Sequence, residues 1–262
     1  MTYETILFEP KNGVAWVTLN RPEKLNAVTS KMITELKDVF DVIEADASLR
    51  VLCLTGSGRA FCPGQDLNDR MGGGDSRPDL GETVETGWNP LMRRLYKLSV
   101  PTLAAVNGVA AGAGANLALA CDIVVALDTA KFVQVYANLG LIPDAGGSYI
   151  LPKLVGLARA RELCMTARPV MAEEAVEMGM IAYSKPESEF ILFVTETVER
   201  MAEQPTFGLV STRYALNQSY SNDLDSQLDL ERDVMQKCGF SDDYAEGVKA
   251  FLEKRQPVFK GR

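Results

Sequence analysis

Three short apolar runs constrain the fold of this chain more than any other feature of its sequence. They cover residues 51–55, 102–106 and 123–126, and the first is followed closely by two glycines. Apolar runs this short, bounded by turn signals, indicate strands that are buried on both faces. A helical repeat of apolar residues over 30–45 precedes the first run. Strands that alternate with helices predict an α/β layered fold with largely parallel strands.

The two ends of the chain carry different patterns. Residues 5–9 and 14–20 alternate apolar and polar side chains around Lys11-Asn12-Gly13, which predicts a β-hairpin. After about residue 151, amphipathic helical stretches predominate, and they cover residues 158–166, 172–178, 189–202, 209–217, 224–236 and 243–254. We therefore expect a core domain with a helical extension, whose apolar faces pack on a neighbouring subunit.

The sequence contains no histidine, which removes several chemistries at once. Ser-His-Asp and Cys-His arrangements are excluded, as is any zinc site that uses imidazole. The five cysteines include no CxxC pair, so we predict neither a metal site nor a disulfide framework. Cys53 and Cys121 are expected in the core. Cys62, in the loop FCPGQ, could act as a nucleophile, but no neighbour in the sequence is placed to stabilise its thiolate.

The charge balance argues against nucleic acid as the main ligand. The chain has 27 Lys and Arg against 35 Asp and Glu, a net charge of -8 at pH 7. A protein that neutralises many phosphates normally shows a basic face, although a local basic pocket can lie on an acidic surface. No run reaches the roughly 18 apolar residues of a membrane span. Because the N-terminus also lacks the pattern of a signal peptide, we expect a cytoplasmic protein.

Glycine-rich segments mark three loops. Residues 57–67 (SGRAFCPGQDL) and 107–122 (NGVAAGAGANLALACD) each follow a predicted strand. Residues 108–120 are too poor in β-branched residues for a strand, so we expect a turn that opens a helix. Free N–H groups from two such turns that point at one spot would stabilise an enolate oxygen, whereas either turn alone would suggest packing only. The third segment, residues 70–81 (RMGGGDSRPDLG), predicts either a functional lid or a tolerated surface insertion.

Together with residues 20–28 (NRPEKLNAV) and 130–156, the first two loops resemble the crotonase family, also called the enoyl-CoA hydratase/isomerase superfamily. The resemblance extends over nearly the whole chain, as far as residues 250–260. It implies a crotonase spiral of repeated ββα units in two roughly perpendicular sheets, which forms a core of residues 1–200 with the coenzyme A and acyl sites. A C-terminal helical trimerisation region of residues 201–262 follows. It also implies an acyl-CoA thioester substrate, no separate cofactor because coenzyme A is part of that substrate, and a homotrimer that often pairs into a hexamer.

The resemblance also assigns residues to thioester binding. The N–H groups of Gln65 and Ala113 would form the oxyanion hole, and segments 21–26 and 60–67 would line the coenzyme A channel. The positions that correspond to coenzyme A contacts are Lys24, Leu25, Ala60, Asp66, Leu67, Phe251 and Lys254. The last two belong to the C-terminal helix, which reaches the coenzyme A of its own or of an adjacent subunit. The two lysines, together with Arg59, are candidate phosphate partners or else solvated surface charges.

Two positions differ from those of the hydratases in this family. The glutamates that position and deprotonate water correspond here to Asn116 and Tyr136, which we expect to contact the substrate. Both are poor bases near neutral pH, since the reference pKa of tyrosine is about 10. A carboxylate appears instead at Asp144, in GLIPDAGG, where hydratases usually have glycine. The resemblance to dienoyl-CoA isomerases and to an aryl-CoA dehalogenase implies that Asp144 is catalytic; the alternative is a cap for a helix that starts near Ala145.

The resemblance is more specific than the family in five segments, which cover residues 61–70, 89–98, 140–147, 204–209 and 227–233. They resemble the members of the family that convert ring-1,2-epoxyphenylacetyl-CoA to oxepin-CoA in phenylacetate catabolism and also shift double bonds in unsaturated acyl-CoA. The resemblance therefore implies an isomerase that stabilises an enolate and moves a proton with one carboxylate. A hydratase of the same family and a non-catalytic acyl-CoA- or RNA-binding relative are the alternatives.

Overall fold

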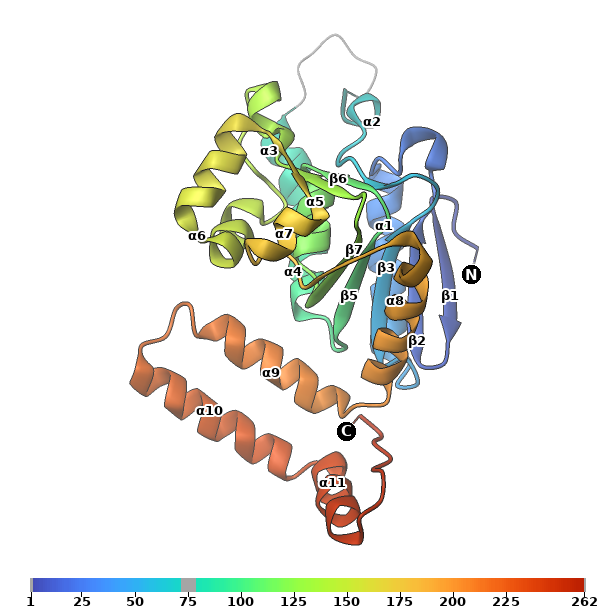
Figure 1. The fold of residues 1–262 in the computed structure, drawn as a ribbon, viewed down its shortest axis with the longest axis vertical. Coiled ribbons are helices and arrows are strands. Elements are labelled where there is room, and N and C mark those ends of the chain that lie inside the picture. Colours follow the sequence, from blue (N-terminus) through green and yellow to red (C-terminus); the bar gives the residue numbers. More distant parts are fainter. Residues whose placement is uncertain (1, 72–78, 262) are drawn as a thin grey trace.

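The computed structural model describes residues 2–71 and 79–261, and two β-sheets form the centre of the molecule (Figure 1). The larger sheet has the order β1–β2–β3–β5–β7–β10. Its strands are β1 (Ile6–Lys11), β2 (Val14–Leu19), β3 (Val51–Gly56), β5 (Thr102–Val106), β7 (Ile123–Leu127) and β10 (Tyr183–Lys185). The predicted hairpin is confirmed, since β1 and β2 are antiparallel, and all other pairs in this sheet are parallel. The three apolar runs form β3, β5 and β7, which lie side by side.

The smaller sheet has the order β4–β6–β8–β9. Its strands are β4 (Ala60–Cys62), β6 (Val109–Ala111), β8 (Lys131–Val133) and β9 (Pro169–Met171), and only β8 and β9 pair in antiparallel fashion. Strand β6 corrects the expectation of a turn and a helix alone over residues 108–120. Its main chain pairs with β4 on one side and β8 on the other, so tertiary pairing overrides the low strand propensity of alanine.

The two sheets alternate along the chain, because β4 follows β3, β6 follows β5 and β8 follows β7. A helix comes after each pair of strands: α2 (Leu67–Met71), α5 (Ala113–Leu119) and α6 (Gly147–Thr166). This repetition is the predicted ββα spiral, and the α/β fold class is confirmed. Since β4 and β6 are parallel neighbours, their carboxyl ends lie at the same edge of the sheet. The two glycine-rich loops that follow them therefore meet.

Helices cover both sheets, and α1 (Ser30–Ala45) begins and ends where its periodicity predicts. The Thr29 side chain accepts a hydrogen bond from the Met32 N–H and caps this helix. The other helical segments up to residue 202 are the turns Pro22–Lys24 and Val135–Leu139, the π-helical turn Val84–Trp88, and α3 (Leu80–Thr83), α4 (Asn89–Lys97), α7 (Ala172–Glu177) and α8 (Glu187–Ala202). The ends of the predicted loop over 70–81 are helical, and its centre, residues 72–78, lies outside the described residues.

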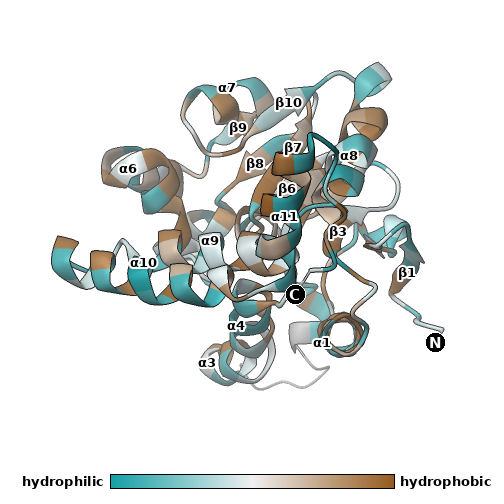
Figure 2. Cartoon of the chain, turned by 90° about the horizontal axis from the view of Figure 1, so that it is seen from below, coloured by the Kyte–Doolittle hydropathy of each residue, from teal (hydrophilic) through white to brown (hydrophobic). Residues whose placement is uncertain are grey.

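The predicted C-terminal helices are confirmed as α9 (Thr206–Gln218), α10 (Leu224–Gly239) and α11 (Asp242–Glu253). They form an arm below the sheets in Figure 1, and apolar and polar residues alternate along α10 in Figure 2. No residue of α10 is buried, and Leu224, Leu228 and Met235 expose their apolar side chains. The arm therefore presents apolar surface that its own chain leaves uncovered.

Within the described parts of the chain, no helix is both long and apolar enough to cross a membrane.

Candidate active site

The two glycine-rich loops contact each other at the carboxyl ends of β4 and β6. A Cβ added at Gly64 would lie 3.1 Å from the Ala111 carbonyl oxygen and 3.3 Å from the Ala113 nitrogen. A Cβ added at Gly114 would lie only 2.3 Å from the Cys62 carbonyl oxygen. Glycine is therefore required at residue 114 for this close approach of two main chains. The loops that the sequence singled out form one continuous main-chain surface.

Gln65 and Ala113, the two predicted donors, lie on this surface. Hydrogen bonds of 2.8 Å, from the Val28 N–H to the Gly64 oxygen and from the Asp66 N–H to the Val28 oxygen, hold the main chain on either side of Gln65. Ala113 is the first residue of α5, a position whose N–H has no acceptor within the helix. Neither N–H donates to another residue that the structure describes. The structure thus brings together two main-chain donors that are free to bind a ligand.

The side chain of Gln65 is held by residues that the sequence analysis did not identify. Its Oε1 accepts a 2.7 Å hydrogen bond from Nε1 of the fully buried Trp88, and its Nε2 donates to Asp69 over 3.5 Å. Asp69 Oδ2 also accepts from the N–H and hydroxyl of Ser30, at the start of α1. No local pattern around Trp88 signals this contact, because the two partners lie on separate elements, the loop after β4 and the π-helical turn Val84–Trp88.

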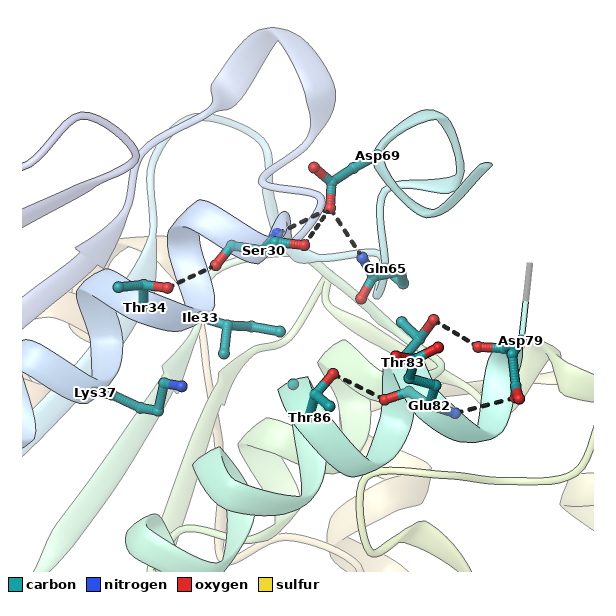
Figure 3. Close-up of a pocket in the computed structure, with 11 residues that line it drawn as sticks. Ser30, Ile33, Thr34, Lys37, Gln65, Asp69, Asp79, Glu82, Thr83 and Thr86 are labelled. Atoms are coloured by element: carbon teal, nitrogen blue, oxygen red, sulfur yellow. Dashed lines mark hydrogen bonds between the residues drawn. The ribbon is translucent and has the colours of Figure 1, made fainter. Parts of the chain in front are cut away.

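A polar cavity of about 470 Å³ lies beside Gln65, between α1 and the segment that runs from α3 to Gly87 (Figure 3). It is lined by Ser30, Ile33, Thr34, Lys37, Gln65, Asp69, Asp79, Glu82, Thr83, Thr86 and Gly87. Three carboxylates against one ammonium group give this cavity a net negative charge, which disfavours a phosphate there. Asn116, Tyr136 and Asp144 do not line the cavity, so it is separate from the cluster that these three residues form.

Asn116, Tyr136 and Asp144 come together in a hydrogen-bonded cluster. Asn116 Nδ2 donates to the Tyr136 hydroxyl over 3.0 Å and to the main-chain oxygen of Asp144 over 2.9 Å. The Tyr136 hydroxyl in turn donates to Asp144 Oδ1 over 2.6 Å. Asn116 follows Ala113 by three residues on α5, and a Cβ at Gly112 would lie 3.8 Å from the Tyr136 ring. The cluster is therefore adjacent to the two free N–H groups.

The alternative role of Asp144 as a helix cap is wrong. Helix α6 begins at Gly147, and Gly146 before it provides no side-chain cap. Ala145 and Gly146 have φ values of 48° and 78°, so the chain turns sharply between Asp144 and the helix. The side chain of Asp144 points to Tyr136 instead, and its Oδ2 accepts no hydrogen bond from the described residues. One carboxylate oxygen is anchored and the other is open.

Burial sets the protonation of two groups next to these loops. Desolvation, followed by the negative charge of Asp144, raises the pKa of Tyr136 above its ordinary value. The phenol therefore remains protonated and acts as a donor. Burial also raises the pKa of the Cys62 thiol to about 12, so Cys62 does not supply the thiolate that a nucleophile requires. In the described parts of the chain, no group of three or more acidic or cysteine side chains is arranged to hold a metal ion.

Five of the seven predicted coenzyme A residues belong to segments 21–26 and 60–67, which hydrogen bonds join to each other: Lys24, Leu25, Ala60, Asp66 and Leu67. Asn26, which is fully buried, donates from Nδ2 to the carbonyl oxygens of Ser57 and Ala60 over 2.9 and 2.8 Å. These bonds hold segment 21–26 against residues 57–60. Lys24 and Arg59 are both exposed, as phosphate partners would need to be.

Arg21 belongs to segment 21–26, but the sequence analysis gave it no contact of its own. Its guanidinium lies 2.9 Å from Asp66 Oδ2 and also donates to the Ala27 carbonyl. Burial works to raise the pKa of Asp66, but hydrogen bonds from Arg21 and from the main chain of Asn68 and Asp69 outweigh it and lower that pKa. Asp66 is therefore a charged, paired residue that fixes the loop to segment 21–26.

Phe251 and Lys254 are not brought to this site within one chain. Both lie at the end of α11, and Figure 1 shows this helix at the opposite end of the molecule from α2. Phe251 is 82% exposed. These two residues can belong to the site only through a neighbouring subunit.

Known proteins match this chain over its full length. Residues 9–262 match the family described as Enoyl-CoA hydratase/isomerase. The 1,2-epoxyphenylacetyl-CoA isomerase of Escherichia coli is 48% identical over 260 residues, which cover 99% of this chain and 99% of that protein. A Rhodobacter capsulatus protein named "Probable enoyl-CoA hydratase" is 43% identical over 262 residues, 100% of both chains.

A solved structure also matches over nearly the whole chain. The crystal structure of an enoyl-CoA hydratase from Bacillus anthracis has 32% sequence identity and a TM-score of 0.91, covering 99% of this chain and 100% of that chain. The ββα spiral and the paired glycine-rich loops agree with these matches in sequence and fold. The chain belongs to the enoyl-CoA hydratase/isomerase family.

Proposed function

We propose that this chain is an isomerase of acyl-CoA thioesters that converts ring-1,2-epoxyphenylacetyl-CoA to oxepin-CoA and shifts double bonds in unsaturated acyl-CoA. The observation that carries the proposal is the Asp144 carboxylate, which has one oxygen held by Tyr136 and the other open, beside the free N–H groups of Gln65 and Ala113. The 48% identity to the Escherichia coli isomerase supports the ring-epoxide substrate.

The mechanism needs one base and two donors. The N–H groups of Gln65 and Ala113 bind the thioester oxygen at about 2.7–3.1 Å and stabilise the negative charge that it gains when a proton leaves the neighbouring carbon. Asp144 Oδ2 takes that proton and returns it to another carbon of the same acyl group. Substrate and product contain the same atoms, so the reaction consumes no water and uses no separate cofactor.

The same geometry argues against a hydratase. Asn116 has no basic group, and the raised pKa of Tyr136 keeps its phenol protonated. Both side chains are also committed to each other and to Asp144. Neither can therefore deprotonate a water molecule for addition to a double bond.

The arm suggests that the working unit is a homotrimer. Residues 201–262 would form the oligomerisation region and residues 1–200 the core that holds the acyl and coenzyme A sites. The exposed apolar side chains of α10 and the distance of Phe251 and Lys254 from their own site support this assembly. Sedimentation should give about three or six times the 28.6 kDa of one chain, and a monomer mass would refute it. A cytoplasmic location stays a prediction from the N-terminal sequence.

A parallel assay separates the candidate functions. The purified protein is incubated with ring-1,2-epoxyphenylacetyl-CoA, with a 3-enoyl-CoA and with crotonyl-CoA, and the products are analysed by chromatography and mass spectrometry. Isomerisation leaves the mass unchanged, whereas hydration of crotonyl-CoA adds the mass of one water. Turnover of the first two substrates at unchanged mass supports the proposal. Hydration as the main reaction, or acyl-CoA binding without any turnover, would favour the hydratase or the non-catalytic relative.

A further inference from the structure

The hydrogen-bonded cluster has a fourth member, Gln134, that lies directly after β8. Its Nε2 donates to Asn116 Oδ1 over 2.9 Å. Gln134 is 4% exposed and Asn116 is fully buried, so both amides are removed from water. A chain of hydrogen bonds thus runs from Gln134 through Asn116 and Tyr136 to the Asp144 carboxylate.

The direction of every bond in this chain is determined. The main-chain oxygen of Asp144 can only accept, so the Asn116 amide must present Nδ2 to it and to Tyr136. Asn116 Oδ1 therefore faces Gln134, which must present its own Nε2. The Tyr136 oxygen receives a hydrogen from Asn116, and its single proton is left to bond Asp144 Oδ1. The amide orientation at residue 116 decides where the phenolic proton points.

We propose that Gln134 is a positioning residue for the Asp144 carboxylate, acting through Asn116 and Tyr136; this inference rests on the proposed isomerase function. Without a donor at residue 134, Asn116 Oδ1 is left buried and unpaired, and the amide is no longer held on that side. A shift of the amide would weaken its hydrogen bond to the Tyr136 hydroxyl and displace that hydroxyl from Asp144. A carboxylate that loses this bond is free to turn away from the position that the open Oδ2 requires.

Two further observations favour this role over simple space filling. Gln134 Oε1 is buried and has no partner among the described residues, a disadvantage that leucine or methionine would avoid at this site. The start of α6 also closes on the amide, because a Cβ at Gly147 would lie 2.2 Å from Asn116 Nδ2. The network is therefore packed tightly enough that one missing donor disturbs its geometry.

The test is a double-mutant cycle between residues 134 and 136, with turnover of a 3-enoyl-CoA as the readout. Gln134→Met keeps the volume and removes the donor, and Tyr136→Phe removes the bond through which Gln134 is proposed to act. In the wild-type background, Gln134→Met should lower kcat about tenfold, a typical effect of a small displacement of a catalytic group, and leave KM within about twofold. In the Tyr136→Phe background it should change kcat less than about twofold, because the linkage is already broken.

Controls make the outcomes distinct. Thr197→Val removes another buried hydroxyl, on α8, and should leave kcat unchanged. Gln134→Asn keeps the amide but shortens the side chain, so it should lower kcat in the wild-type background and not in the Tyr136→Phe background, as Gln134→Met does. It takes the place of Gln134→Met in the cycle if that variant does not fold. An equal loss of kcat in both backgrounds, or unchanged kcat in both residue 134 variants, would overturn the positioning role alone. Absence of isomerase turnover in the wild-type protein would overturn the proposed function and this inference with it.

Discussion

Replacing Asp144 by asparagine separates the proton-carrying role of this side chain from its structural contacts. The Tyr136 hydroxyl, now 2.6 Å from Oδ1, can donate equally to an amide oxygen. Asn116 Nδ2 and the Gly147 N–H donate to the main-chain oxygen of residue 144, and these bonds do not depend on its side chain. The helix α6 needs no cap from it either. Only the open Oδ2 changes, into an NH₂ group that cannot accept a proton.

The expected effect is therefore a loss of turnover with the fold retained. Removal of a general base typically lowers turnover by 10²–10⁴, which corresponds to about 3–5 kcal/mol in the barrier. The affinity for the thioester should be largely kept, because the substitution leaves the N–H groups of Gln65 and Ala113 and segments 21–26 and 60–67 unchanged. Because a neutral hydrogen bond replaces a charge-assisted one, the free energy of unfolding should change by about 1 kcal/mol.

The assay follows the conversion of a 3-enoyl-CoA to its conjugated isomer by ultraviolet absorbance, with calorimetric binding of a saturated acyl-CoA measured in parallel. Asp128→Asn is the matched control, since Asp128 is also half-buried and its side chain makes no hydrogen bond to the cluster. Near-normal isomerisation by Asp144→Asn would refute the single-base mechanism. A greater loss in Asn116→Ala than in Asp144→Asn would refute it as well.

Three other predictions follow from the same contacts. Tyr136→Phe and Asn116→Ala should each lower kcat about 10–100-fold, which is less than the loss in Asp144→Asn, because they disturb the position of the base without removing it. Steady-state kinetics of the three variants measures this order. Gly114→Ala should lower the free energy of unfolding by about 1–3 kcal/mol, because its Cβ would lie 2.3 Å from the Cys62 oxygen. Gly239→Ala is the control, since a Cβ there has no neighbour within 4 Å. Urea unfolding compares the two variants, and equal effects would contradict the close approach at residue 114. Arg21→Gln should destabilise the protein at neutral pH by about 1–3 kcal/mol, because Asp66 loses its partner. Because the pKa of Asp66 is lowered in the folded state, this contribution is complete above the unfolded-state pKa of about 4 and is lost as the pH falls through the folded-state pKa. The free energies of unfolding of wild type and variant should therefore converge in acid. A difference that stays constant with pH would count against the ion pair.

The sequence by itself determined those parts of the molecule whose signals are local. The apolar periodicity of residues 30–45 predicts α1 to the residue, because a helix forms from contacts three and four positions apart. The alternation on either side of Lys11-Asn12-Gly13 predicts the hairpin for a similar reason. The identity of the polar residues at 116, 136 and 144 also comes from the sequence, and the structure brings those three side chains together.

Only the tertiary structure decided which contacts join these parts. Strand β6 forms because β4 and β8 offer main-chain partners on both sides, although its residues have little preference for a strand. Asp144 turns to Tyr136 rather than to α6 because the chain reverses at Ala145 and Gly146. Trp88 is 23 residues from its partner Gln65, and Gln134 is 18 residues from its partner Asn116. Sequence periodicity does not predict such contacts, because they depend on how separate elements pack. A sequence pattern records the local preference of each segment, whereas the position of each donor and acceptor depends on the register of the sheets and the packing of the helices on them.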